Sequence, residues 1–262
     1  MPDSWHDEAN ARHYADFNRR FGLYQAASED LVDLAGFGPD ATVVDLACGT
    51  GVSTRVIARR LGPGGRVTAV DGSAAMLAIA AGEVADQRAS WLRSQAEDIG
   101  GRLTGPVDAV ICNAAIWQTD LDAVAQAVGG LLRPAGRFVF NVGAGFLAGT
   151  GPASALPTAL QAIAAREYGW SPPARVRPAA ARLSVASIRD RLARAGLTVE
   201  EVVPLSYPQS ADMLRAWLSV PVFTAAHLPG LGYDHRMRVL ELAAGELSEP
   251  GESGWLAFVA RR

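Results

Sequence analysis

A glycine turn between two short apolar segments most constrains how this chain can fold. Residues 42–46 form a short, mainly apolar run, and the turn after it contains Gly49 and Gly51. A second apolar run at 66–70 ends in Asp71. Glycine lets a backbone approach a ligand closely, and an acid at the end of the second strand is placed to bind ribose hydroxyls. The pattern therefore predicts a nucleoside-binding α/β domain.

The turn lacks a third glycine, which separates it from the dinucleotide fingerprint. Thr54 stands where the pattern Gly-x-Gly-x-x-Gly has its last glycine. That glycine serves close packing beside a pyrophosphate. Its absence favours a nucleoside without phosphates.

Alternating strands and helices over residues 42–142 predict parallel strands joined by right-handed crossovers. Helical spacing of aromatic residues indicates helix over 5–35, in which Ser28 is expected to cap a second helix. Breakers such as Gly62-Pro63 separate the elements. The expected strands are 42–46, 66–70, 89–94, 107–112, 137–142, 197–204 and 255–260, and the main expected helices are 53–61, 73–85, 120–132, 157–167 and 187–195.

Composition narrows the class of protein. A chain of 262 residues with 49% hydrophobic content can bury a full core, and it has no apolar run long enough for a bilayer. A net charge of −3 without a basic run argues against nucleic-acid binding. Four scattered histidines give no metal signal. The polar N-terminus and two cysteines, Cys48 and Cys112, favour a reducing cytoplasm, with both thiols expected to line the pocket as small apolar groups.

The segment from Asp45 to Gly51, followed by Asp71, resembles class I S-adenosylmethionine-dependent methyltransferases. The nearest type is the small-molecule group that includes the ubiquinone/menaquinone methyltransferases. The resemblance spans residues 40–142 and, more loosely, 183–262. It implies a Rossmann-like α/β fold: a seven-stranded, mostly parallel sheet with helices on both faces, a final antiparallel strand and a helical substrate cap.

The expected domain organisation separates a core from its cap. Residues 145–182 are rich in Ala, Gly and Pro and are too long for a plain connection, so they are interpreted as either a functional lid or a disordered segment. The expected parts are an N-terminal helical cap at 1–35, a core at 36–144 and 183–262 with a helical insert at 209–247, and the lid insertion at 145–182.

The resemblance implies a site for S-adenosylmethionine beyond the carboxyl ends of the strands. The turn should wrap the methionine part, Met76 should lie on the adenine, and Asp71 should hold the ribose, because a carboxylate accepts two bonds. Gln95 departs from the family, which has an Asp for the adenine amino group; Glu97 or Asp98 could replace it. The implied cofactor residues are Tyr14, Asp45, Ala47, Gly49, Gly51, Asp71, Gly72, Met76, Gln95, Ala96, Glu97 and Asn113.

Methyl transfer from a sulfonium mainly requires alignment and a dry site. A base is needed only when the acceptor must lose a proton first. The candidates for such a group are His227, His13 (with His6 in the same expected N-terminal helix) and Tyr14, although a lone histidine or tyrosine on a helix also often serves packing. Apolar cap residues suit an apolar or aromatic acceptor, or pack the cap on the sheet: Trp117, Phe146, Trp170, Trp217 and Phe223.

These patterns predict methyl transfer to a small, apolar or aromatic acceptor, at oxygen or carbon, as part of biosynthesis in specialised metabolism. Three alternatives remain open. One is a relative that binds the same cofactor but catalyses another reaction, such as a cyclisation, since Gln95 and Ile116 replace the Asp and His of the family. The others are a peptide, protein or RNA methyltransferase and a non-catalytic binding protein.

Overall fold

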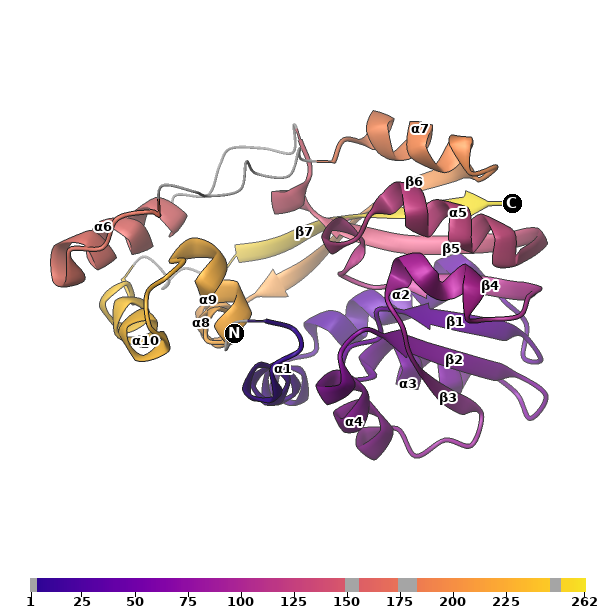
Figure 1. The fold of residues 1–262 in the computed structure, drawn as a ribbon, viewed down its shortest axis with the longest axis horizontal. Helices are drawn as coiled ribbons and strands as arrows, with labels where there is room; N and C mark the ends of the chain where they lie inside the picture. The colour runs from indigo at the N-terminus through magenta and orange to yellow at the C-terminus, as the bar shows by residue number, and fades with distance from the viewer. Residues whose placement is uncertain (1–3, 149–155, 174–182, 246–250) are drawn as a thin grey trace.

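The computed structural model describes residues 4–148, 156–173, 183–245 and 251–262. Over these residues the chain forms a seven-stranded sheet in the order β3-β2-β1-β4-β5-β7-β6 (Figure 1). Strands β1 to β5 are parallel, and β7 runs antiparallel to both of its neighbours. The predicted Rossmann-like fold is confirmed. Its strands are β1 (Thr42–Leu46), β2 (Arg66–Asp71), β3 (Ala89–Arg93), β4 (Val107–Cys112), β5 (Leu132–Gly143), β6 (Thr198–Gln209) and β7 (Gly251–Arg261).

Helices cover both faces of the sheet. On one face, α5 (Leu121–Leu131) and α7 (Val185–Arg194) pack on β4 and β5. On the other, α2 (Leu23–Ala35) and α3 (Val52–Arg60) pack on β1 and β4, while α4 (Ala74–Glu83) packs on β2 and β3. The central strands β1 and β4 are mainly apolar because helices bury both of their faces.

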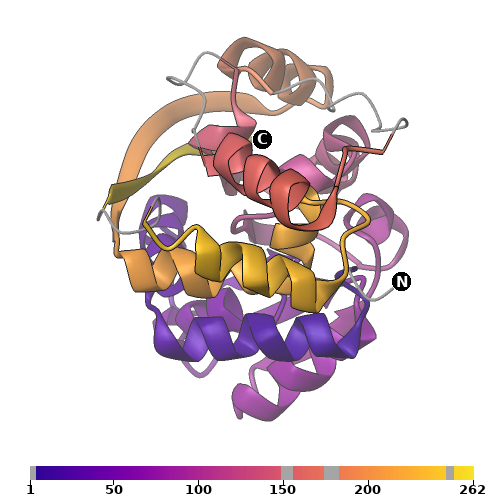
Figure 2. The ribbon, with the colours of Figure 1, turned by 90° about the vertical axis from the view of Figure 1, so that its left-hand side faces the viewer.

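A group of helices, called the cap here, lies beyond one end of the sheet (Figures 1 and 2). Helix α6 contacts α9 and α10, and α1 contacts α8 and α9. Helix α6 is the one element of the predicted lid that the structure describes in full, and most of the rest of 145–182 lies outside the described residues. The cap helices are α1 (Glu8–Arg20), α6 (Leu156–Tyr168), α8 (Ala211–Leu218), α9 (Pro221–His227) and α10 (Tyr233–Leu242).

The N-terminal helices begin at different residues from those predicted. Asp7 caps α1 by accepting from the N–H groups of Ala9 and Asn10. Helix α2 starts after Gly22, so Ser28 lies inside it and caps nothing. The Ser28 hydroxyl donates instead to the Tyr24 carbonyl at 2.7 Å, the bond to the preceding turn that serine makes within helices.

Other differences concern the sheet. Strand β5 begins at Leu132 and includes the segment 133–136 expected to be a turn, and the β6–β7 pairing extends to Gln209 and Gly251.

Both cysteines are buried and pack in the core, so they do not line the pocket as expected. Among the described helices, none has the length and apolar character needed to cross a membrane.

Candidate functional site

The glycine turn after β1 brings the backbone to the end of β2. Gly49 and Gly51 have φ values of +53° and +84°, a conformation in which a Cβ is disfavoured. A Cβ on Gly51 would lie 3.0 Å from the Val84 side chain and 3.1 Å from that of Ala80. Gly51 therefore allows α3 to pack closely on the residues of α4 and the segment that follows it, whereas Gly49 forms part of the turn surface itself.

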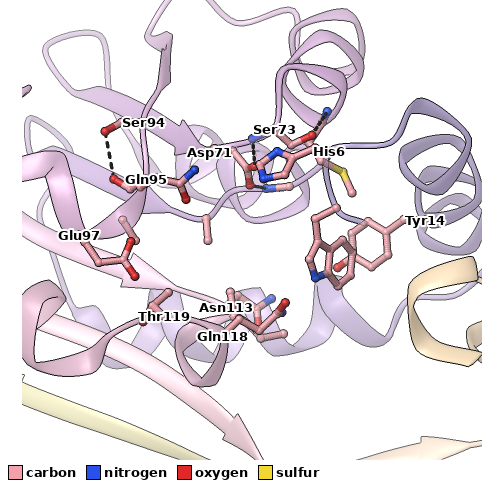
Figure 3. A pocket seen from close by; sticks show the side chains of 18 residues that line it. His6, Tyr14, Asp71, Ser73, Ser94, Gln95, Glu97, Asn113, Gln118 and Thr119 are labelled. Atoms are coloured by element: carbon pink, nitrogen blue, oxygen red, sulfur yellow. Dashed lines mark hydrogen bonds between the residues drawn. The ribbon is translucent and has the colours of Figure 1, made fainter. Parts of the chain in front are cut away.

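Asp71 is held by two backbone N–H groups at the end of β2. Its Oδ2 accepts from Gly49 at 2.9 Å, and its Oδ1 accepts from Ser73 at 2.8 Å. Burial raises the pKa of Asp71, while the bonds from Ser73 and Gly49 and the nearby His6 act in the opposite direction. Each carboxylate oxygen has two lone pairs, so both oxygens keep acceptor capacity. His6 lies beside this carboxylate (Figure 3).

Asp45 lies behind the turn. Both of its oxygens accept from the Ser53 hydroxyl at 2.8 Å, and Oδ2 also accepts from the Thr54 hydroxyl at 2.5 Å. The side chain is fully buried, and burial raises the pKa of Asp45 to about 6. Asp45 thus ties the end of β1 to the first turn of α3.

A cavity of about 270 Å³ opens beyond the carboxyl ends of β1, β2, β3 and β4 (Figure 3). Parallel α/β sheets bind their ligands at this edge. Of the predicted cofactor residues, the structure places Asp45 and Gly51 outside the lining. The ten that line the cavity are Tyr14, Ala47, Gly49, Asp71, Gly72, Met76, Gln95, Ala96, Glu97 and Asn113.

Eight lining residues were not among the predicted cofactor residues. They come from the segment before α1, from positions next to predicted residues, and from the loop after β4. The adjacency of Ser73 to Asp71 and of Ser94 to Gln95 was a usable signal, whereas Trp5 carried none beyond helical spacing. The eight are Trp5, His6, Ser73, Ser94, Ala114, Ala115, Gln118 and Thr119.

Two polar side chains lie at the β3 end of the cavity. The Gln95 amide lies against Gly72, where an added Cβ would be 2.8 Å from Nε2. Glu97 accepts the backbone N–H of Asp120 through Oε1 at 2.8 Å. Both side chains offer oxygen acceptors to a ligand at this end, and Met76 supplies an apolar surface from α4.

An aromatic group surrounds Tyr14 near the glycine turn. The ring of Tyr14 lies 5.5 Å from that of Trp5, 5.6 Å from Tyr24 and 6.3 Å from Phe223, measured between centroids. Burial raises the pKa of Tyr14 well above its ordinary value. Its hydroxyl is therefore protonated at neutral pH.

The two predicted catalytic histidines lie away from the cavity lining. The ring of His13 lies 5.5 Å from that of Tyr233. His227 is at the end of α9, where burial lowers its pKa. Tyr14 is the predicted catalytic residue that the described structure places in the lining.

The five predicted acceptor residues form two stacked pairs and one separate side chain. Trp117 stacks on Phe146 at 4.3 Å, and Trp217 stacks on Phe223 at 3.9 Å. The Trp217 indole also donates to the Tyr24 hydroxyl at 2.9 Å. Trp170 packs among cap helices and donates to the Pro229 carbonyl. All five lie outside the lining of the described cavity.

Comparison with known proteins places this site in context. Residues 43–136 match the methyltransferase domain family. A 2-phytyl-1,4-naphtoquinone methyltransferase of Thermosynechococcus vestitus is 48% identical over 60 residues, 23% of this chain and 27% of that protein. A trans-aconitate 2-methyltransferase of Deinococcus radiodurans is 35% identical over 142 residues, 54% of this chain and 48% of that protein. The chain thus spans less than half the length of these two relatives.

A solved structure extends the likeness in fold. The geranyl diphosphate C-methyltransferase of Streptomyces coelicolor A3(2), solved with Mg²⁺, geranyl diphosphate and S-adenosyl-L-homocysteine, superposes with a TM-score of 0.55. The match covers 90% of this chain and 78% of that one, at 20% identity. At this identity the comparison shows the fold.

Proposed function

Because residues 43–136 match the methyltransferase domain family, we propose that this chain is a class I methyltransferase that binds S-adenosylmethionine and transfers its methyl group to a small acceptor. The observation that carries the proposal is the fixed Asp71 carboxylate at the edge of the cavity. Gly49 and Ser73 hold it from the backbone. A carboxylate held in this way can accept both hydroxyls of a ribose.

The cavity residues fit the parts of this cofactor. Asp71 suits the ribose, and Met76 offers an apolar surface to the adenine. The oxygens of Gln95 and Glu97 are acceptors for the adenine amino group, which restores the function that the family assigns to an Asp at position 95. Ala47 and Gly49 line the cavity at the turn, and the lack of a side chain at Gly49 leaves the space beside the Tyr14 ring open to the methionine part.

When bound, S-adenosylmethionine supplies a methyl group on a positively charged sulfonium. The residues of this chain align the reactants and exclude water, which are the main requirements of an in-line displacement. Tyr14 is protonated, because burial raises its pKa, so it positions its neighbours and does not remove a proton. His6 lies beside Asp71, the residue that we propose binds the ribose.

We therefore propose an acceptor whose reacting atom is nucleophilic without help from a base, such as a carboxylate or an acidic enol or phenol. The stacked pair Trp217–Phe223 lies beside Tyr14, which lines the cavity, and so supports an acceptor with an apolar or aromatic body. The names of the two curated relatives also refer to small molecules, a naphthoquinone and a carboxylic acid. Both are methyltransferases, so a cyclisation on this fold is not proposed.

Calorimetric titration with S-adenosylmethionine and S-adenosylhomocysteine tests the cofactor. We expect saturable binding of both, and no binding of NAD at the same concentrations, because the turn lacks the third glycine. Failure to bind either sulfur nucleoside would contradict the proposal. A panel of carboxylic acids, enols and phenols, read by mass spectrometry for the gain of one methyl group, then tests the acceptor class.

A further inference from the structure

Two asparagines, one buried and one partly buried, join helix α2 to the loop after β4. The Asn141 side chain on β5 is fully buried. Its Nδ2 donates to Asn113 Oδ1 at 2.8 Å, and its Oδ1 accepts the backbone N–H of Ala114 at 2.6 Å. Asn113 Nδ2 in turn donates to the Tyr24 carbonyl at 3.0 Å and to the Ser28 hydroxyl at 2.9 Å.

Both polar atoms of the Asn141 amide, Oδ1 and Nδ2, bond to residues of the loop after β4. Strand β5 pairs with β4 and β7 through its backbone, so the sheet does not need this side chain. A buried amide is costly unless it is hydrogen-bonded, and an apolar residue would suit a central strand better. The Asn141 amide therefore stabilises the loop after β4, to which it bonds.

The residue held by Asn141 has a disfavoured backbone conformation. Ala114 has φ +58°, a region that a side chain with a Cβ rarely adopts. Such conformations persist where the surrounding structure fixes them. Ala114, Ala115, Gln118 and Thr119 all line the cavity from this loop, and Trp117 lies between them in the sequence.

We propose that Asn141 is a positioning residue for the cofactor site, a role that rests on the proposed function. Its amide holds Ala114 in the left-handed conformation and fixes Asn113, so that the loop 113–119 keeps the shape that forms one wall of the cavity. Asn141 itself lies outside the lining and touches no reacting group. Asn113 shares the role and connects the same loop to α2.

The first experiment measures the dissociation constant of S-adenosylmethionine by calorimetry. Asn141→Leu removes both bonds, and we expect the dissociation constant to rise about tenfold or more, as for the loss of a buried hydrogen bond. Val139→Ala is the matched control, because Val139 is also buried on β5 and packs in the core. It should lower stability and leave the dissociation constant within about threefold of the wild type.

Two further variants separate positioning from general damage. Ala114→Gly in the Asn141→Leu background should recover part of the affinity, because glycine adopts a positive φ freely. Asn141→Asp, when protonated, can still donate to Asn113 and accept from Ala114. Since burial raises the pKa of a carboxyl group, this variant should bind like the wild type at pH 6 and more weakly at pH 8.5, each compared with the wild type at the same pH.

The results for these variants either support or contradict the positioning role of Asn141. A dissociation constant for Asn141→Leu within threefold of the wild type would overturn it. If that variant does not fold, Asn141→Asp decides, and affinity that follows the wild type at both pH values overturns the proposal. Amide hydrogen exchange over residues 113–119 gives a reading without any ligand: exchange in Asn141→Leu should exceed that in Val139→Ala, and equal exchange would contradict the role. A wild type that binds no cofactor would contradict the proposed function instead.

Discussion

The carboxylate of Asp71 accepts the backbone N–H of Gly49 at 2.9 Å, which joins the end of β2 to the turn after β1. The glycine turn and Asp71, which lie more than twenty residues apart in the sequence, are therefore in direct contact. A ligand that binds Asp71 lies directly against the glycine turn. This contact makes both residues targets for testing the site.

Asp71→Asn should weaken S-adenosylmethionine binding by about 10- to 100-fold, because each bond to a charged acceptor contributes about 1.5–3 kcal/mol. Calorimetry measures the change. Asp86→Asn is the control, since Asp86 lies beyond α4, outside the cavity lining, and binds Arg88. Equal affinities of wild type and Asp71→Asn would remove the ribose role of this carboxylate.

Gly49→Val should abolish measurable cofactor binding while the protein still unfolds cooperatively. Valine is strongly disfavoured at a φ of +53°, and its branched side chain would enter the space beside Tyr14. Gly38→Val is the comparison, because Gly38 has open space around it and no positive φ. Retained affinity in Gly49→Val would show that the turn does not contact the ligand.

Asp45 should make stability depend on pH. Burial raises its pKa to about 6 in the folded protein, above the value of about 3.9 in an unfolded chain. The folded state therefore binds the proton more tightly, and this contribution to stability is present below about pH 4 and lost as the pH rises through about 6. Relative to Asp45→Asn, the wild type should lose of order 3 kcal/mol of unfolding free energy between pH 4 and pH 7.5.

Urea unfolding of both proteins, followed by tryptophan fluorescence, measures this difference. The comparison with Asp45→Asn removes the effects of other titrating groups, because both proteins share them. A difference in unfolding free energy that stays constant from pH 4 to pH 7.5 would mean that Asp45 is ionised normally in the folded state.

The bond between the Trp217 indole and the Tyr24 hydroxyl should link α8 to α2. Trp217→Phe and Tyr24→Phe each remove it and keep an aromatic ring, and each should cost about 1 kcal/mol of unfolding free energy. The double variant should cost less than the sum, because the second substitution removes nothing further from this bond. Strict additivity in thermal or urea unfolding would show that the bond does not stabilise the cap.

The sequence predicted the core far better than the cap. Strands β1 to β4 and their helices follow local signals: apolar runs, breakers such as Gly62-Pro63, and the glycine turn. The start of α2 did not follow such a signal, because Ser28 bonds to Tyr24 and Asn113 inside the folded protein. Tertiary contacts of this kind leave no local pattern in the sequence.

The candidate site also contains some residues that the sequence predicts and others that depend on how the chain packs. Asp71, Gly72 and Gln95 were predictable because strand ends in a parallel sheet meet at one edge. Asp45 belongs to the same motif, yet Ser53 and Thr54 engage its carboxylate behind the turn. Trp5 and His6 reach the cavity only through the path of the segment before α1, which depends on how that helix packs on the rest of the chain.

The position of Trp5 and His6 has a practical consequence for producing the protein. An affinity tag fused to the N-terminus would join the chain a few residues before two side chains of the cavity wall. Strand β7 runs antiparallel to β5, so the C-terminus lies at the opposite edge of the sheet from the cavity (Figure 1). Purification tags, fluorescent labels and surface attachment for binding measurements therefore belong after Arg262.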